Sequence, residues 1–163
     1  MKTKKITVLA LAASLAMILS FVESQIPAFV AVPGVKVGLA NIAVVFALYK
    51  MGWKEAVGIS LVRVFFVSIM FGTGVSLFYS LAGAALSLSG MILLKKCGLF
   101  SMTVVSITGA VLHNVGQILM ACLLLETNVI VYYLPFLIVF GIVAGVVVGL
   151  VAAVLVRRIK VEY

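Results

Sequence analysis

Long apolar runs separated by short polar breaks dominate the chain. Six apolar segments can be drawn, over residues 6–22, 37–49, 56–71, 75–94, 102–125 and 129–156. Runs of this kind predict membrane-spanning helices, because about 20 apolar residues in a helix cross the hydrocarbon core of a bilayer. The second segment is short, whereas the sixth is long enough to tilt. The pattern predicts an all-α integral membrane protein with six transmembrane helices in one domain, residues 1–163.

Composition supports this fold class and excludes several functions. Of the 163 residues, 66% are hydrophobic and 10% are charged, whereas about 25% of residues are charged in an ordinary soluble domain. A soluble enzyme is therefore excluded. The two cysteines, Cys97 and Cys122, lie far apart and lack a metal-binding spacing, so we expect free thiols.

The basic residues predict the orientation. In a six-span arrangement, ten of the twelve lysines and arginines fall on one side of the membrane. These ten are Lys2, Lys4, Lys5, Lys50, Lys54, Lys95, Lys96, Arg157, Arg158 and Lys160. The positive-inside rule then places both termini in the cytoplasm of a multi-pass plasma-membrane protein. The net charge of +8 is thus explained by topology, and we expect no nucleic-acid partner.

The first segment also has features of a signal peptide. A basic start, Met1-Lys-Thr-Lys-Lys5, precedes its apolar run. No small-x-small cleavage site follows, since residues 18–24 read Ile-Leu-Ser-Phe-Val-Glu-Ser. We therefore expect a retained first helix rather than a cleaved one.

Polar side chains within the predicted spans gather in one half of the membrane. Such residues are costly in a bilayer and point to function. The candidates for ligand binding are Glu23, Gln25, Lys36, Asn41, Arg63, Tyr79, His113, Asn114 and Gln117. They belong to the first five predicted helices and the loop after the first, and lie mainly in the outer half, whereas the inner half is Val, Leu, Ile, Ala and Gly. A channel would need polar groups at every depth, so the pattern predicts a binding cup open to the outside.

Two of these residues leave alternatives open. Arg63 is either a ligand contact or half of a structural ion pair with Glu23. His113 is either a ligand contact or a hydrogen-bonded contact between helices. Lys36, Arg63 and two helix N-termini near the cup favour an anionic ligand, because helix N-termini attract negative charge; Glu23 argues against it.

Residues 24–36 predict a capping loop over the cup. The stretch is mostly apolar but contains Pro27, Pro33 and Gly34, which prevent one continuous helix.

Two rows of small residues predict close helix packing. One comprises Gly141, Gly145, Gly149 and Ala153, and the other comprises Ala12, Ala16 and Ser20. Each row either packs inside the bundle or forms a partner surface, and one row could serve each purpose.

Known catalytic patterns are missing from the sequence. There is no G-x-x-x-x-G-K-[ST] loop for ATP and no HExxH or Cys/His zinc pattern. The chain has no aspartate, so the paired aspartate-rich boxes that hold magnesium diphosphate in prenyl synthases cannot exist. We expect no enzyme activity, no cofactor and no metal.

Several motifs carry a resemblance to one bacterial membrane family. They are Glu23-Ser-Gln-Ile-Pro27, Pro33-Gly-Val-Lys-Val-Gly-Leu-Ala-Asn41, Arg63, Phe71-Gly-Thr-Gly74, Tyr79-Ser-Leu-Ala-Gly83 and His113-Asn-Val-Gly-Gln117. The chain resembles the Gx transporter family, also called heptaprenyl diphosphate synthase component I, over nearly its whole length. That family is similar to the substrate-binding S components of energy-coupling factor transporters.

The resemblance implies six helices, an outward-facing site under the first outer loop, and a first helix that docks on a transmembrane coupling subunit. Ala12, Ala13 and Ala16 would carry the docking. The resulting hypothesis is an S-component-like subunit that binds a small anionic or amphiphilic solute, with uptake driven by separate ATPase subunits. One alternative is a non-catalytic membrane subunit that assists polyprenyl diphosphate or quinone synthesis. Another is a purely structural subunit of a membrane redox complex.

Overall fold

The computed structural model describes residues 2–25, 38–71 and 74–159, and this part of the chain is helical. The elements are α1 (Lys2–Gln25), α2 (Asn41–Lys50), α3 (Trp53–Phe71), α4 (Gly74–Cys97), α5 (Met102–Leu125), the 3-10 helix η1 (Val129–Tyr133) and α6 (Leu134–Arg158). Each predicted apolar segment therefore forms a helix. The fifth matches its predicted bounds, whereas the second begins at Asn41 rather than at residue 37.

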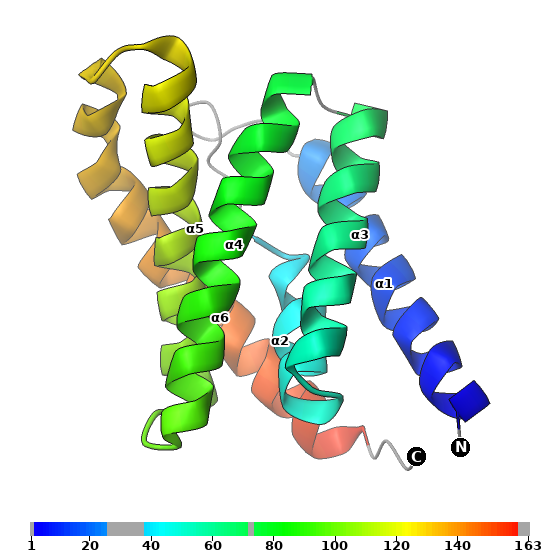
Figure 1. Ribbon diagram of the computed structural model, residues 1–163. Helices are drawn as coiled ribbons and strands as arrows, with labels where there is room; N and C mark the ends of the chain where they lie inside the picture. The colour runs from blue at the N-terminus through cyan, green and yellow to red at the C-terminus, as the bar shows by residue number, and fades with distance from the viewer. Residues whose placement is uncertain (1, 26–37, 72–73, 160–163) are drawn as a thin grey trace.

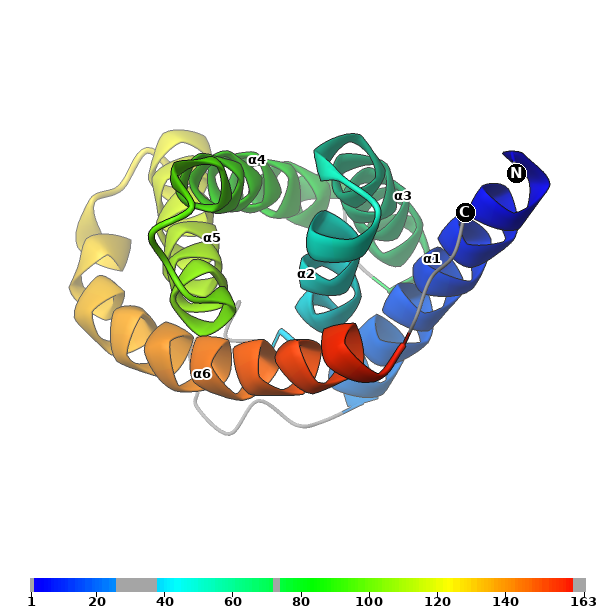
Figure 2. The same ribbon diagram turned by 90° about the horizontal axis from the view of Figure 1, so that it is seen from below.

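The helices form a bundle around the short helix α2 (Figures 1 and 2). Helices α3, α4, α5 and α6 pack in chain order, α6 also packs on α2, and α1 packs on α3 and α2. The start of α1 and the end of α6 lie at the same end of the bundle (Figure 1). This is the arrangement that an even number of membrane crossings produces.

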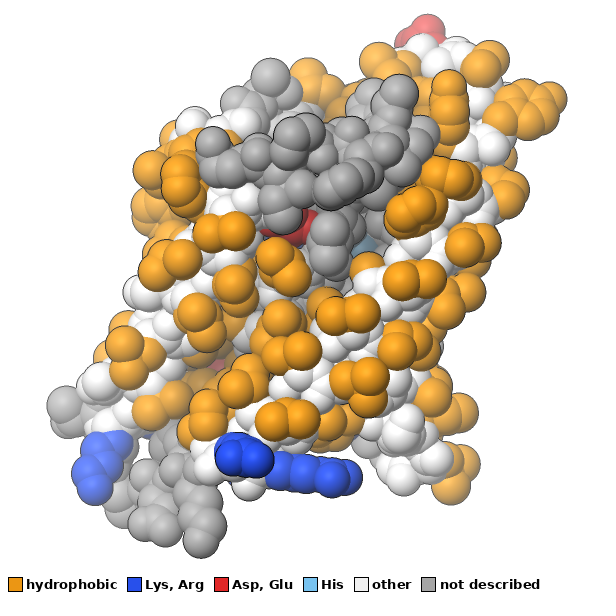
Figure 3. Space-filling model, turned by 180° about the vertical axis from the view of Figure 1, so that it is seen from behind, with side chains coloured by type: hydrophobic (Ala, Val, Ile, Leu, Met, Phe, Trp, Pro, Cys, Tyr) orange, Lys and Arg blue, Asp and Glu red, His pale blue; other side chains and the backbone are white. Residues whose placement is uncertain are grey.

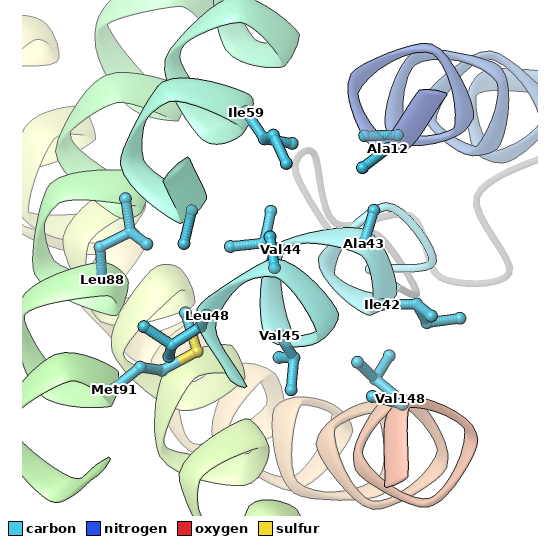
Figure 4. Packing of buried hydrophobic residues seen from close by; sticks show 14 of the residues in the cluster. Ala12, Ile42, Ala43, Val44, Val45, Leu48, Ile59, Leu88, Met91 and Val148 are labelled. Atoms are coloured by element: carbon cyan, nitrogen blue, oxygen red, sulfur yellow. The ribbon is translucent and has the colours of Figure 1, made fainter. Parts of the chain in front are cut away.

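Helix α2 is enclosed by its neighbours. Residues 42–48 are all buried, and their side chains meet Ala12 of α1, Ile59 of α3, Met91 of α4 and Val148 of α6 (Figure 4). A helix that is apolar on every face is stable only when it is buried on every face. Its ten residues span about 15 Å, half of a hydrocarbon core of about 30 Å. Helix α2 therefore fills only about half of the depth of the bundle interior, and residues of other elements surround the remaining half.

The surface of the bundle is suited to lipid. Large apolar side chains cover the face seen in Figure 3, and Leu123, Leu93 and Ile69 are among the large apolar residues more than 60% exposed. Four helical stretches are long and apolar enough to cross a membrane: residues 4–23, 74–97, 102–125 and 129–158. The chain is therefore a multi-pass membrane protein by these criteria, while spans by α2 and α3 stay a prediction.

Basic residues mark the end of the bundle that carries the termini (Figure 3). There, Lys5 of α1 forms an ion pair with Glu55 in the first turn of α3, and the hydrogen bond from Lys5 lowers the pKa of that carboxyl group. Lys95, in the last turn of α4, donates to the carbonyl of Leu48. This satisfies one of the acceptors that a helix C-terminus leaves open, so a basic side chain anchors α2 at this end.

The glycine row of α6 packs against α5. A Cβ at Gly145 would lie 2.5 Å from the Cα of Ile107, and one at Gly149 would lie 2.8 Å from the Cα of Thr103. Only glycine permits backbones this close, which confirms internal packing for this row. In the other row, Ala12, Ala16 and Ser20 are buried inside the protein.

Both cysteines are free, as predicted.

Candidate functional site

A polar cavity of about 200 Å³, which we call the polar cup, lies above the N-terminus of α2. All six α-helices contribute to its wall. The lining comprises Ser20 and Glu23 of α1, Gly38, Asn41 of α2, Arg63, Val64, Val67, Ser68 and Phe71 of α3, Ser76 and Ser80 of α4, Ala110, His113, Asn114 and Gln117 of α5, and Gly141 and Ala144 of α6. The cup thus occupies part of the bundle interior that the short helix α2 does not reach.

A turn at Gly38 connects the cup to α2. Gly38 has φ +76°, a left-handed conformation that favours glycine. Its carbonyl accepts a hydrogen bond of 2.8 Å from the N–H of Asn41, and its own N–H donates to the Glu23 carboxylate. The end of α1 is therefore tied to the start of α2 at the wall of the cup.

Arg63 is the central cation of the cup. It is buried within α3, and its Nη1 donates a hydrogen bond of 3.2 Å to Oδ1 of Asn41. The Glu23 carboxylate, also buried, attracts the guanidinium electrostatically. A buried arginine needs such compensation because its desolvation is costly. Glu23, Asn41 and Arg63 thus form one polar cluster that joins α1, α2 and α3.

The opposite wall is formed by α5, which approaches α4 closely at Gly83. A Cβ at Gly83 would lie 2.8 Å from the carbonyl oxygen of His113, 3.0 Å from His113 Cε1 and 3.0 Å from Gln117 Cγ. This glycine therefore permits the packing that places His113 and Gln117 at the cup. Nδ2 of Asn114 donates a hydrogen bond of 2.8 Å to the carbonyl of Leu137 in α6, so Asn114 also joins two helices.

Six of the nine predicted ligand-binding residues line the cup: Glu23, Asn41, Arg63, His113, Asn114 and Gln117. Tyr79 is partly buried in α4 but does not line it. Lys36 and the side chain of Gln25 lie outside the described residues. Of the predicted capping loop 24–36, the first two residues belong to α1, and the rest also lies outside the described part.

Sequence reasoning missed the hydroxyl groups of the cup. Ser20, Ser68, Ser76 and Ser80 all line it. Helical spacing offered a signal, because Ser20 precedes Glu23 by three positions and Ser76 precedes Ser80 by four, and residues so spaced share a helix face. Serine is nevertheless common inside transmembrane helices as a packing residue, which made the signal weak.

The chemistry available in the cup is that of hydrogen bonding and charge recognition. Arg63 supplies a cation and Glu23 an anion, the serines and Gln117 supply neutral donors and acceptors, and His113 supplies an imidazole. Among the described residues, no group of three or more His, Cys, Asp or Glu side chains could hold a metal ion. The geometry fits the recognition of a small polar molecule.

The predicted docking residues lie elsewhere on α1. Ala12 and Ala16 are buried in the core, and Ala13 is partly buried against it. In this conformation the two buried alanines support internal packing. Docking of a partner through this row stays a prediction, and it requires α1 to expose them.

Comparison with known protein families gives a match over most of the chain. The model of a family described as heptaprenyl diphosphate synthase component I matches residues 12–155. This range includes every residue of the polar cup named above. No curated protein and no solved structure matches the chain.

Proposed function

Because the chain belongs to the heptaprenyl diphosphate synthase component I family, we propose that this membrane protein binds a small solute in its polar cup as part of a larger assembly. In this proposal it is the substrate-binding subunit of an ATP-driven uptake transporter, similar to an energy-coupling factor S component. A transmembrane coupling subunit and separate ATPase subunits complete the transporter. The chain itself is not an enzyme.

The observation that carries this proposal is a polar cup above an apolar floor. Asn41 lines the cup, while the seven residues that follow it in α2 are apolar and buried on all sides. Continuous conduction requires polar groups or water along the whole path, and α2 interrupts such a path. A cup of this kind binds a solute from one side, and release on the other side requires a conformational change driven by partners.

The cup limits the size of its ligand. Pockets for drug-sized ligands enclose about 300–1,000 Å³, whereas the cup encloses about 200 Å³. The proposed ligand is therefore a small polar molecule. Its anionic group faces Arg63 and the N-terminus of α2, where negative charge is favoured. Its neutral polar groups, or one end of an amphiphile, face Gln117 and the serines.

The family description favours a second candidate, a non-catalytic membrane subunit that works beside a polyprenyl diphosphate synthase. Arg63 could then contact a diphosphate group. The cup is too small to enclose a long polyprenyl chain, and without aspartate the chain lacks the usual carboxylate pairs that hold magnesium diphosphate. These two features favour the transporter proposal.

Co-purification from the native membrane distinguishes the two candidates. The tagged protein is extracted in a mild detergent, and the bound proteins are identified by mass spectrometry. The transporter proposal expects ATPase subunits and a membrane coupling subunit in stoichiometric amounts. Recovery of a soluble prenyl synthase without ATPase subunits would support the second candidate instead.

A further inference from the structure

A second hollow lies at the opposite end of the molecule from the polar cup. It is an apolar groove of about 530 Å³ between α1 and α6, with α2 as its floor. Val8, Leu11 and Leu15 form one wall, Ile42 and Phe46 belong to the floor, and Leu155 belongs to the other wall. Helix α1 diverges from α6 at this end (Figure 2), and the largely buried Ile42, Ala43 and Phe46 of α2 lie at the bottom of the groove between them.

The groove has the length of one membrane leaflet. Its wall on α1 extends from Lys4 to Leu15, twelve residues whose Cα positions span about 16 Å along the helix axis. Half of a hydrocarbon core is about 15 Å thick. The volume of the groove also falls within the range of about 300–1,000 Å³ that is typical of ligand pockets. One extended acyl chain of a phospholipid has the matching shape and polarity.

Charge identifies the class of headgroup. Lys4 lines the end of the groove, and Arg158 directly precedes Ile159, which lines the same end. This is the basic end of the bundle, where lysine and arginine side chains are visible on the surface (Figure 3). A phosphate group held near Lys4 therefore meets complementary charge, whereas a zwitterionic headgroup adds its own cation.

We propose that the groove between α1, α2 and α6 is a binding site for an anionic phospholipid of the inner leaflet. One acyl chain lies along Val8, Leu11 and Leu15 over the side chain of Phe46. The headgroup phosphate contacts Lys4. The bound lipid fills the space that α1 and α6 leave over α2 and holds α1 against the bundle. This site is separate from the polar cup and does not depend on what the cup binds.

The test is lipid-dependent thermal stabilisation of the purified protein in a nonionic detergent. The probes are dioleoyl phosphatidylglycerol and dioleoyl phosphatidylcholine, which differ only in the headgroup. At about tenfold excess over its dissociation constant, the anionic lipid is expected to raise Tm by about 3–6 °C. Phosphatidylcholine is expected to raise it less.

Two variants separate the charge from the apolar groove. Lys4→Gln is expected to reduce the effect of phosphatidylglycerol to that of phosphatidylcholine. Val8→Phe, which fills the groove, is expected to abolish both effects. The matched controls are Lys54→Gln, an exposed lysine in the first turn of α3, and Val154→Phe, a 54% exposed position on α6. Both should respond like wild type.

Equal stabilisation of wild type by the two lipids would overturn the proposal. So would an unchanged preference for phosphatidylglycerol in Lys4→Gln, a surface variant that should fold normally. Full lipid stabilisation of a folded Val8→Phe protein would show that the acyl chain of the lipid binds elsewhere. Tight retention of a protein helix in the groove, detected by crosslinking at position 8 in the native membrane, would assign the groove to a protein partner.

Discussion

The cluster of Glu23, Asn41 and Arg63 combines structural and binding roles in the same atoms. Arg63 is held by Asn41 at 3.2 Å and attracted by the buried Glu23. Electrostatic attraction therefore links Arg63 to Glu23, while a direct ion pair between them, which the sequence left as an alternative, stays a prediction. A ligand contact by Arg63 stays a proposal. It does not conflict with the pair, because a guanidinium group has five N–H donors and lines the cup.

Removal of the cation tests this pair. We expect Arg63→Gln to lower the free energy of unfolding by about 3–5 kcal/mol, because it leaves the buried Glu23 without its counter-charge. The double variant Glu23→Gln/Arg63→Gln should be more stable than the sum of the single effects predicts. Thermal unfolding in detergent measures all three. Arg158→Gln, an exposed position at the end of α6, is the control and should change little. Additive single effects would mean that Glu23 and Arg63 do not interact.

The alanine row of α1 gives a second prediction for a single residue. Ala16 is fully buried against the core. We therefore expect Ala16→Leu to reduce the free energy of unfolding by about 1–3 kcal/mol through overpacking. Ala10→Leu, on the exposed side of the same helix, is the matched control. A folded, equally stable Ala16→Leu protein that fails to co-purify with its partners would instead support the docking role.

Among the helices, α5 and α6 make the closest backbone approach that the glycines reveal. A Cβ at Gly145 would lie 2.5 Å from a backbone atom of Ile107, whereas a Cβ at Gly58 of α3 meets nothing within 4 Å. Gly145→Ala should destabilise the protein by about 1–3 kcal/mol, since a backbone cannot give way as a flexible side chain can. Gly58→Ala should be neutral or stabilising by up to about 1 kcal/mol. Equal effects in thermal unfolding would contradict the packing of α6 on α5.

The sequence predicted the positions of the helices better than it predicted which helices pack against each other. Apolar runs set the helix positions, so the fifth segment was predicted at 102–125 and α5 has these bounds. The start of α2 was predicted too early. The sequence stays mostly apolar across the turn at Gly38, so hydropathy does not show that the helix begins only after this turn. Tertiary contacts decide which helix each row of small residues packs against. In this chain every helix has apolar residues on all its faces, so the sequence pattern does not reveal these contacts.

For the whole molecule, the firmest prediction is its orientation in the membrane. The positive-inside rule places the basic end, with both termini, in the cytoplasm. Reporter domains fused after Lys50, Lys96 and Tyr163 should all give a cytoplasmic signal in cells. An external signal after Lys96 would overturn the six-span arrangement and would place the mouth of the polar cup on the wrong side for uptake.

The polar cup itself was predicted from depth alone. Placing each polar residue along its own helix brought Glu23, Arg63 and His113 to one half of the membrane, and these residues line one cavity. Tyr79 was expected there too but does not line the cavity, because depth does not say which face of α4 looks inward. Ser76 and Ser80 on the same helix were overlooked, because depth also does not show that their face of α4 is turned toward the cup. The inward face of a helix becomes known only once its neighbours are placed.

The most direct test of the account is native mass spectrometry of the gently solubilised protein, with a variant that fills the cup. Ser80→Phe places a large side chain at the wall of the cup, and Ser89→Phe, at an exposed position of the same helix, is its control. The account predicts that wild type and Ser89→Phe retain the same small molecule and that folded Ser80→Phe protein lacks it. Retention of that molecule by Ser80→Phe at the wild-type level would contradict binding in the polar cup.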